Sequence, residues 1–254
     1  VLVTYFFLIY SWRTVWQGIA ILIILLLPFV ILNTIKTVNL ESREVDNNSK
    51  LKKLKIKSWR RRDVIKDYRF YIVSLNMLAM PWMATGIFVY QSFISESKMW
   101  AVYTIPKAFM VYSITSIITL FLSGILVDKF TGRKLILFMN IPLLIAMFVL
   151  FQFNHEIFAY IFLGLIGVSN GLANILGSST WAEIYGVKYI GSIKALTTAF
   201  MVFSTAFGTA VFGLLIDNNF TIEYIAFVGG VYIVISLILL IIFRKTIEPV
   251  KLSN

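Results

Sequence analysis

The amino-acid sequence predicts an all-α polytopic membrane protein. Of its 254 residues, 59% are hydrophobic and only 14% are charged. The mean hydropathy is +0.86, which is far from the balance of a soluble domain. Several apolar runs reach the length of about 20 residues that a helix needs to cross a bilayer. We therefore expect helices that face lipid as well as one another.

The residue content excludes several classes of function. The chain has no Cys and a single His, His155, which excludes thiol catalysis, a disulfide framework and a metal cluster built on His or Cys. The sequence also lacks the glycine-rich loop that cradles ATP and the H-E-x-x-H and G-x-S-x-G motifs of hydrolases. We therefore expect that the protein is not an enzyme and that it uses no cofactor and no metal.

The chain opens on an apolar stretch, 1–10, which we interpret as the end of a truncated transmembrane helix. Residues 11–35 form the first complete span, and Pro28 inside it is tolerated because neighbouring groups in a membrane protein bond the freed carbonyl. A basic linker, 36–69, separates this span from the rest of the chain.

The remainder of the sequence, 70–245, reads as a six-helix bundle, and 246–254 is a polar tail. Short polar turns separate six apolar ranges, each long enough to form a membrane-spanning helix. These ranges are 70–95, 101–127, 135–153, 157–181, 190–216 and 222–243.

The basic residues predict the orientation. When the linker is put on one side and the spans alternate, all but three of the 23 Lys and Arg residues fall on that side, and the exceptions are Arg13, Lys98 and Lys107. Cytoplasmic segments carry such an excess, so the linker and the carboxyl terminus are predicted to be cytoplasmic. Topology thus accounts for the net charge of +11, and we expect no nucleic-acid partner. The linker is expected to contact anionic membrane lipid.

A short loop between two spans carries the most specific pattern. Gly124, Asp128, Gly132, Arg133 and Lys134 resemble the signature G-x-L-x-D-x-x-G-R-[KR] of the major facilitator superfamily, with one extra residue before Gly132. The resemblance implies a cytoplasmic loop that gates conformational change. We expect Gly132 to permit a turn that fixes Arg133 near Asp128. The alternative is a loop in which the cations only set topology.

The resemblance covers nearly the whole chain, which is also loosely similar to monocarboxylate-transporter-like bacterial permeases. It implies half of a major-facilitator fold: six transmembrane helices plus a helix stub, with 11–35 as the sixth helix of the family fold. It further implies transport of a small solute across the plasma membrane by alternating access, with the missing amino-terminal half of the same transporter as partner. The alternative function is a membrane-embedded enzyme or an accessory subunit of another class.

Polar side chains in the range 157–181 are the first candidates for a substrate cavity. Asn170, Asn174 and Ser178 share a helix face with Gly167 and Gly171. The glycines are predicted to let another helix approach closely. The amides either bond to that helix or face an aqueous cavity, because an unpaired amide in the membrane is costly. In the family, the corresponding tenth helix lines the central cavity.

The range 70–95 offers Asn76, Trp82 and Thr85 as further cavity candidates, since the corresponding seventh helix of the family also lines the cavity. Pro81 is expected to bend or break this helix and to free carbonyls for a substrate or an ion. The alternative is ordinary helix packing.

Lys107 is the last candidate, because the sequence places it about two turns into its helix from the extracellular end. A cation at that depth is costly. It either extends outward to the interface or faces the cavity and attracts an anionic substrate. An organic anion is therefore one candidate for the solute.

Overall fold

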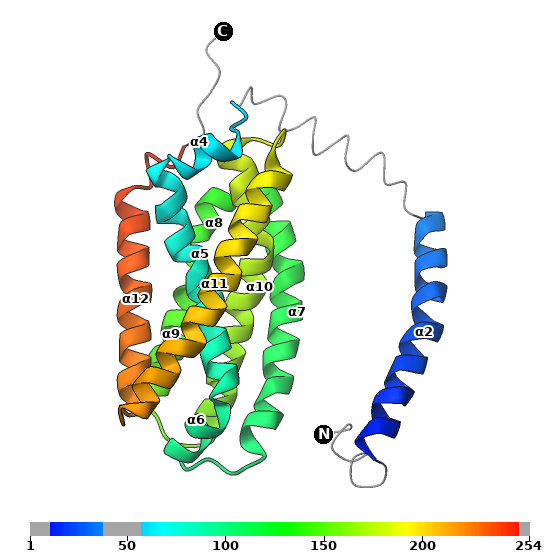
Figure 1. Ribbon diagram of the computed structural model, residues 1–254, viewed down its shortest axis with the longest axis vertical. Helices are drawn as coiled ribbons and strands as arrows, with labels where there is room; N and C mark the ends of the chain where they lie inside the picture. The colour runs from blue at the N-terminus through cyan, green and yellow to red at the C-terminus, as the bar shows by residue number, and fades with distance from the viewer. Residues whose placement is uncertain (1–10, 38–56, 249–254) are drawn as a thin grey trace. The chain divides into compact units, whose positions relative to one another are not determined.

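A computed structural model describes residues 11–37 and 57–248 of the chain. The predicted stub 1–10, most of the linker and the last residues of the tail lie outside this part. The chain divides into two compact units, 1–54 and 55–254. In the described ranges every regular element is a helix (Figure 1): α2 (Trp12–Thr37), α4 (Arg61–Ile65), α5 (Tyr68–Val89), α6 (Gln91–Ser97), α7 (Thr104–Phe130), α8 (Gly132–Met139), α9 (Ile141–Gln152), α10 (Ile157–Tyr185), α11 (Ile190–Asp217) and α12 (Ile222–Ile242).

Seven segments of the described residues are long and apolar enough to cross a membrane. The count of six helices plus a stub is one too low, because the span in 11–35 precedes a bundle that already holds six. The chain is therefore an all-α polytopic membrane protein. The seven segments are Arg13–Leu32, Tyr68–Val89, Thr104–Phe130, Gly132–Gln152, Ile157–Tyr185, Ile190–Asp217 and Ile222–Ile242.

The helix of the first unit, α2, is continuous through Pro28. At its start the hydroxyls of Ser11 and Thr14 lie 3.1 Å apart. A serine at this position favours a helix start, because its oxygen can accept from a free backbone N–H of the first turn.

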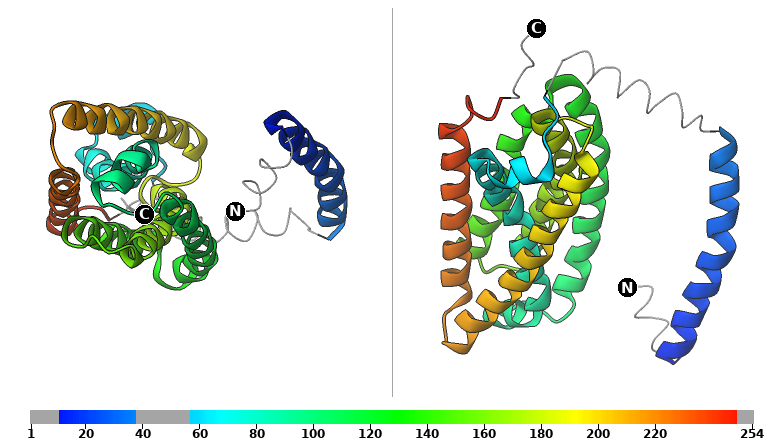
Figure 2. Two further views of the ribbon diagram at one scale, coloured as in Figure 1. Left: turned by 90° about the horizontal axis from the view of Figure 1, so that it is seen from below. Right: turned by 45° about the horizontal axis from the view of Figure 1, so that its top comes forward.

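In the second unit, α5 is the central helix. It contacts α11, α12 and α10, and an end-on view shows it inside the bundle (Figure 2). Its backbone carbonyls are bonded by side chains of three neighbouring segments: Tyr232 Oη donates to Leu75 O at 2.7 Å, Asn140 Nδ2 to Asn76 O at 2.6 Å and Ser204 Oγ to Leu78 O at 3.1 Å. These bonds tie α5 to its neighbours on either side of Met77 O, the carbonyl that Pro81 leaves without its helical donor.

The helices alternate in direction, so the bundle has two distinct ends (Figure 1). The α4 end carries the start of α8, the junction of α10 with α11 and the end of α12. The α6 end carries the start of α7 and the junctions of α9 with α10 and of α11 with α12. Among the described residues of the bundle, Lys and Arg lie near the α4 end, except Lys98 and Lys107.

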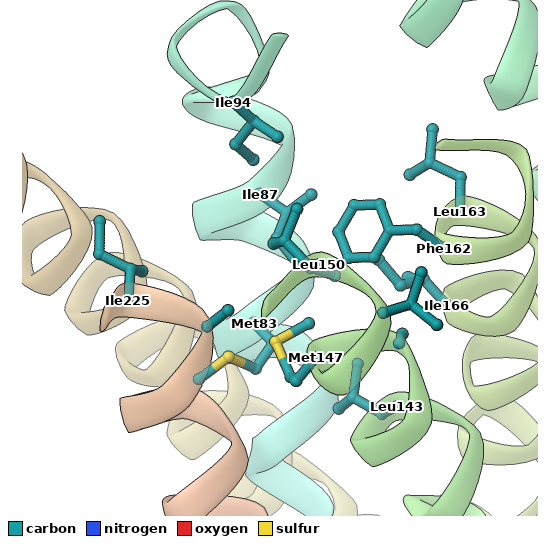
Figure 3. Close-up of a cluster of buried hydrophobic side chains, with 14 of the residues drawn as sticks. Met83, Ile87, Ile94, Leu143, Met147, Leu150, Phe162, Leu163, Ile166 and Ile225 are labelled. Carbon is teal, nitrogen blue, oxygen red and sulfur yellow. The ribbon is translucent and has the colours of Figure 1, made fainter. Parts of the chain in front are cut away.

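Large apolar side chains fill the interior toward the α6 end (Figure 3). Met83 and Ile87 of α5 meet Met147 and Leu150 of α9 and Phe162 of α10, and all five are at most 2% exposed. Because lipid tails are as apolar as these side chains, close van der Waals packing stabilises the contact more than the removal of water does.

Close approach of α7 to α10 depends on glycine, as predicted. A Cβ on Gly171 would lie 2.7 Å from Ser116 O and 2.8 Å from Leu120 N, and both are backbone atoms of α7. A Cβ on Gly167 would collide with Thr115 and with the carbonyl of Tyr112. The small-residue pair therefore lets two helix backbones touch, as in other membrane helices.

The predicted span 135–153 is two helices, α8 and α9, which meet at Asn140. Pro142 is the second residue of α9 and cannot donate a backbone hydrogen bond, so the helix is interrupted just before it. The carbonyl that Pro142 leaves without a helical donor is Phe138 O, which accepts from Asn140 N–H, and Ser169 Oγ donates to the adjacent Met139 O at 2.8 Å. The interruption is thus bonded internally, as the membrane requires.

Buried charges tie each end of the bundle together. At the α4 end, Arg69 pairs with Asp67 at 2.7 Å, and Tyr185 Oη donates to the same carboxylate at 3.2 Å. At the α6 end, Lys98 Nζ is 2.7 Å from both Glu223 Oε1 and Asn154 Oδ1, and its side chain is 0% exposed. Arg69 and Asp67 are buried together, whereas Lys98 is buried against a Glu223 side chain that is 38% exposed, and in both pairs the opposite charge offsets the cost of desolvation.

Candidate functional site

A pocket of about 280 Å³ opens between α5, α10 and α11 and is called the central pocket below. Apolar and sulfur-containing side chains form much of its wall, and several amide and hydroxyl groups face it. It is lined by Ser74, Met77, Leu78, Met80, Pro81 and Ala84 of α5, Met139 of α8, Asn170, Ala173, Asn174, Gly177, Ser178 and Trp181 of α10, and Lys194, Thr197, Thr198, Phe200 and Met201 of α11.

Three of the predicted cavity residues lie together in this wall. Asn170, Asn174 and Ser178 follow one another at four-residue spacing along α10 and all line the central pocket. Asn170 also donates to Ser116 Oγ of α7 at 2.9 Å. Asn170 therefore both bonds to a neighbouring helix and borders the central pocket. Asn174 Nδ2 donates to Asn170 O at 2.9 Å and is exposed.

The α5 wall is a continuous helix. The expectation that Pro81 breaks the helix is wrong, since α5 runs from Tyr68 to Val89. Proline still leaves Met77 O without its usual helical donor, and both Met77 and Pro81 line the pocket. Methionine side chains adapt to ligands of irregular shape, which suits a binding wall.

Lys194 is a pocket residue that was not among the predicted site residues. It is the charged residue among those that line the central pocket, and no ion pair involves it within the described ranges. It shares a face of α11 with Thr197, Thr198 and Met201, at the three-, four- and seven-residue spacing of a helix. That spacing is visible in the sequence, where Lys194 lies inside the predicted range 190–216, but Lys194 was counted only among the cations that predict the orientation.

The other cavity candidates lie elsewhere. Asn76 is 0% exposed and its Nδ2 is 3.5 Å from Ser236 Oγ of α12. Trp82 packs edge-on against Tyr232, with ring centroids 4.5 Å apart. Thr85 does not border the central pocket. None of the three lines the central pocket, and Trp82 also lies against Phe207 of α11, with ring centroids 5.9 Å apart.

Lys107 lies closer to the start of its helix than expected. Helix α7 begins at Thr104, so Lys107 is in the first turn rather than two turns deep, and its backbone N–H donates to Tyr103 O at 3.1 Å. The side chain is exposed at the α6 end and does not border the central pocket.

In the loop from Gly124 to Lys134, the acid that holds Arg133 is Glu183 of α10. Glu183 accepts from Gly132 N at 2.7 Å and from Arg133 N at 3.1 Å, and Arg133 Nε lies 3.3 Å from the same carboxylate. We expected a turn to fix Arg133 near Asp128, but the ion pair that Arg133 forms in the described residues is with Glu183. Asp128 is exposed in the last turn of α7, where no ion pair with another described residue forms.

Gly132 does not have the backbone role that was expected of it. The residue with positive φ is Thr131, at 71°, and Gly132 is the first residue of α8. A Cβ on Gly132 would lie 2.5 Å from Ser179 Oγ and 3.1 Å from Thr180 N. Gly132 is thus needed for close contact with α10, which brings its N–H to Glu183.

The family model described as Major Facilitator Superfamily matches residues 71–254. The chain belongs to the Major Facilitator Superfamily. No curated protein matches the chain. Membership agrees with the loop pattern, and it makes this protein a multi-pass membrane protein of a transporter superfamily.

The contact of Glu183 with the loop was harder to predict from the sequence than the loop itself. Glu183 lies about 50 residues from Gly132 in the sequence, and their contact arises only when α8 packs beside α10. An acid favours the amino terminus of a helix, but sequence alone does not say which acid reaches it. In the described ranges, no group of three His, Cys, Asp or Glu side chains is placed to hold a metal ion.

Proposed function

We propose that this chain forms the carboxyl-terminal wall of the solute pathway in a secondary transporter, and that the solute binds in the central pocket. The observation that carries the proposal is the gathering of Asn170, Asn174, Ser178 and Lys194 around one pocket in an apolar bundle. Polar side chains at membrane depth are costly unless they are bonded or face water. A polar solute would replace that water.

The position of the pocket supports alternating access. Asn170 is near the middle of α10, and Pro81 is near the middle of α5. Solute sites of such transporters lie near the bilayer midplane, between two halves that rock around the site. The amino-terminal half of the same transporter would supply the facing wall, with residues 11–35 as its last helix and 36–69 as the linker.

The distribution of charge supports an orientation with the α4 end in the cytoplasm, since cytoplasmic segments are rich in Lys and Arg. The linker and the carboxyl terminus would then be cytoplasmic, and the plasma membrane is the proposed location.

An organic anion is the solute class that the pocket favours. Lys194 offers one positive charge, and the hydroxyls of Thr197 and Thr198 lie on the same face of α11. Together they can bind a carboxylate by charge-assisted and neutral hydrogen bonds. The methionines of the opposite wall would contact the apolar part of the solute.

Thiol accessibility tests the pathway without knowledge of the solute. In a cysteine-free background of the intact protein, Asn174→Cys and Ser178→Cys should react with a charged methanethiosulfonate reagent. Phe148→Cys on the exposed surface of α9 should not, because a thiolate forms only in contact with water. Equal protection of all three cysteines would contradict an aqueous pathway beside α10.

Lys194→Gln tests the solute class. Uptake of radiolabelled lactate, benzoate, glucose and tetraethylammonium is measured for the intact protein, and KM is determined for a transported probe. An anionic probe should lose about fivefold in apparent affinity, the equivalent of about 1 kcal/mol. Lys188→Gln is the matched control, because Lys188 is exposed at the same end and does not border the pocket. An equal KM in both variants would exclude Lys194 from solute binding.

A further inference from the structure

A second pocket, of about 350 Å³, lies at the α4 end between the start of α8 and the end of α12. It is called the basic pocket below, and it shares no lining residue with the central pocket. Its position can be followed in Figure 1, where both helix ends lie at the end that carries α4. It is lined by Thr131, Arg133, Lys134, Ile136, Leu137, Leu240, Arg244, Lys245, Ile247 and Glu248.

The charge of the basic pocket is strongly positive. Four cations and one acid line it. Arg133 is partly neutralised by Glu183, but Lys134, Arg244 and Lys245 form no ion pair within the described part of the chain. After Glu248 is counted against one of them, an excess of positive charge still faces the pocket, so an anion is the ligand that it favours.

The cations are held by the fold and do not belong to a loose tail. After α12 the chain turns back, with Thr246 N and Ile247 N donating to Phe243 O at 3.0 and 3.2 Å. Ile247 is 5% exposed, and Arg69 Nη1 donates to Glu248 O at 3.0 Å. The turn between these two anchors carries Arg244 and Lys245. A ligand would therefore find the cations already gathered, which reduces the entropy lost on binding.

Apolar residues form the other side of the basic pocket. Ile136, Leu137 and Leu240 line it. The adjacent side chains of Phe138, Ile241 and Ile242 are all more than half exposed on the bundle surface. The basic pocket thus stands where the apolar surface of a membrane-spanning bundle meets its charged end. A free anion would use only the cations, whereas a molecule with an anionic head and an apolar tail would use both sides.

We propose that the basic pocket binds the phosphate headgroup of an anionic membrane phospholipid. Lys134 reaches the headgroup from the start of α8, and Arg244 and Lys245 reach it from the end of α12. Basic pockets at the ends of transmembrane helices suit such headgroups. A bound lipid would connect α8 to the end of α12. This inference requires only that the bundle lies in a membrane, and it is independent of the solute and of the central pocket.

The test uses the intact protein in nanodiscs of phosphatidylcholine with a minor fraction of phosphatidylglycerol, and native mass spectrometry of the lipid that stays bound. Arg244→Gln/Lys245→Gln should retain phosphatidylglycerol at least about tenfold less well than the unaltered protein. The matched control is Lys129→Gln/Lys188→Gln, which removes the same charge from exposed residues at the same end that do not line the basic pocket. This control should retain the lipid.

Three outcomes would overturn the proposal. Equal loss of lipid in both double variants would mean diffuse attraction by the basic end. Equal retention of phosphatidylcholine and phosphatidylglycerol would exclude an anionic site. Release of the lipid by millimolar inorganic phosphate would indicate a site for a free anion. Lys134→Gln is a second variant, on the opposite side of the pocket, and should also weaken retention. Thermal unfolding in detergent checks that each variant is folded.

Discussion

At the scale of the residue, two acids near one loop have different surroundings. Glu183 accepts two backbone N–H groups and the Arg133 side chain, and it is partly buried. Asp128 is exposed beside the same loop. The first arrangement stabilises the start of α8, since a carboxylate at a helix amino terminus satisfies free donors and opposes the helix dipole. An exposed acid such as Asp128 is free to contact another part of the protein.

Glu183→Gln should therefore lower the free energy of unfolding by about 1–2 kcal/mol, because the neutral amide accepts from the same N–H groups less strongly. Asp128→Asn should leave the unfolding temperature unchanged but reduce transport, if its charge contacts the opposite half as the gating hypothesis holds. Thermal unfolding of the purified protein and uptake normalised to expression separate the two effects. Lys129→Gln controls for loss of a charge in the loop. Normal transport by Asp128→Asn would leave the loop with only a topological role.

Spacing along one helix predicted part of the central pocket. Asn170, Asn174 and Ser178 were found because residues three or four apart share a helix face. Asn76, Trp82 and Thr85 are candidates because the corresponding helix of the family lines the cavity, but α5 has neighbours on several faces. Periodicity alone therefore could not say which face of α5 borders a pocket.

At the scale of the element, the contact between α7 and α10 depends on the absence of two side chains. Gly171→Ala should destabilise the bundle by about 1–3 kcal/mol, because the new methyl group would meet backbone atoms of α7 that cannot move without shifting the helix. The measurement is thermal unfolding in detergent. Gly177→Ala on the same helix is the control, since a Cβ there meets nothing within 4 Å. Equal unfolding temperatures would show that α7 adapts freely.

The helix boundaries illustrate what an apolar run can predict. The ranges 157–181 and 190–216 end within a few residues of α10 and α11, because apolar length and polar turns mark both limits. The range 135–153 reads as one span but holds two helices, since the break at Asn140 depends on Pro142 and on bonds from Ser169 and Asn140 to other segments. Such bonds are properties of the packed bundle and leave no local pattern.

At the scale of the whole molecule, alternation of the helices collects the described cations of the bundle near one end. If that end is cytoplasmic, an impermeant maleimide added to intact cells should label Asn218→Cys, at the junction of α11 with α12, but not Lys129→Cys. Permeabilised cells, in which both cysteines should react, control for intrinsic accessibility. Labelling of Lys129→Cys alone in intact cells would reverse the orientation.

The class of the molecule was the most predictable feature, because hydropathy and charge are summed over many residues and tolerate local errors. The membrane fold and the facilitator superfamily follow from length, composition and one loop pattern, and the family match agrees with them. The central pocket requires three helices that are far apart in the sequence. The sequence therefore did not show that Lys194 lines a pocket, because the helices that complete the pocket are distant in the chain.

The ion pair at the α6 end also gives the bundle a chemical reporter. The Lys98 amine is enclosed by Glu223 and Asn154 and has no exposed side-chain surface, whereas Lys107 nearby is exposed. Amine-directed acylating reagents should therefore modify Lys107 rapidly and leave Lys98 unmodified for as long as α6, α12 and the segment between α9 and α10 stay together. The acylation of Lys98, followed by mass spectrometry, would record the fraction of time in which that end of the bundle separates.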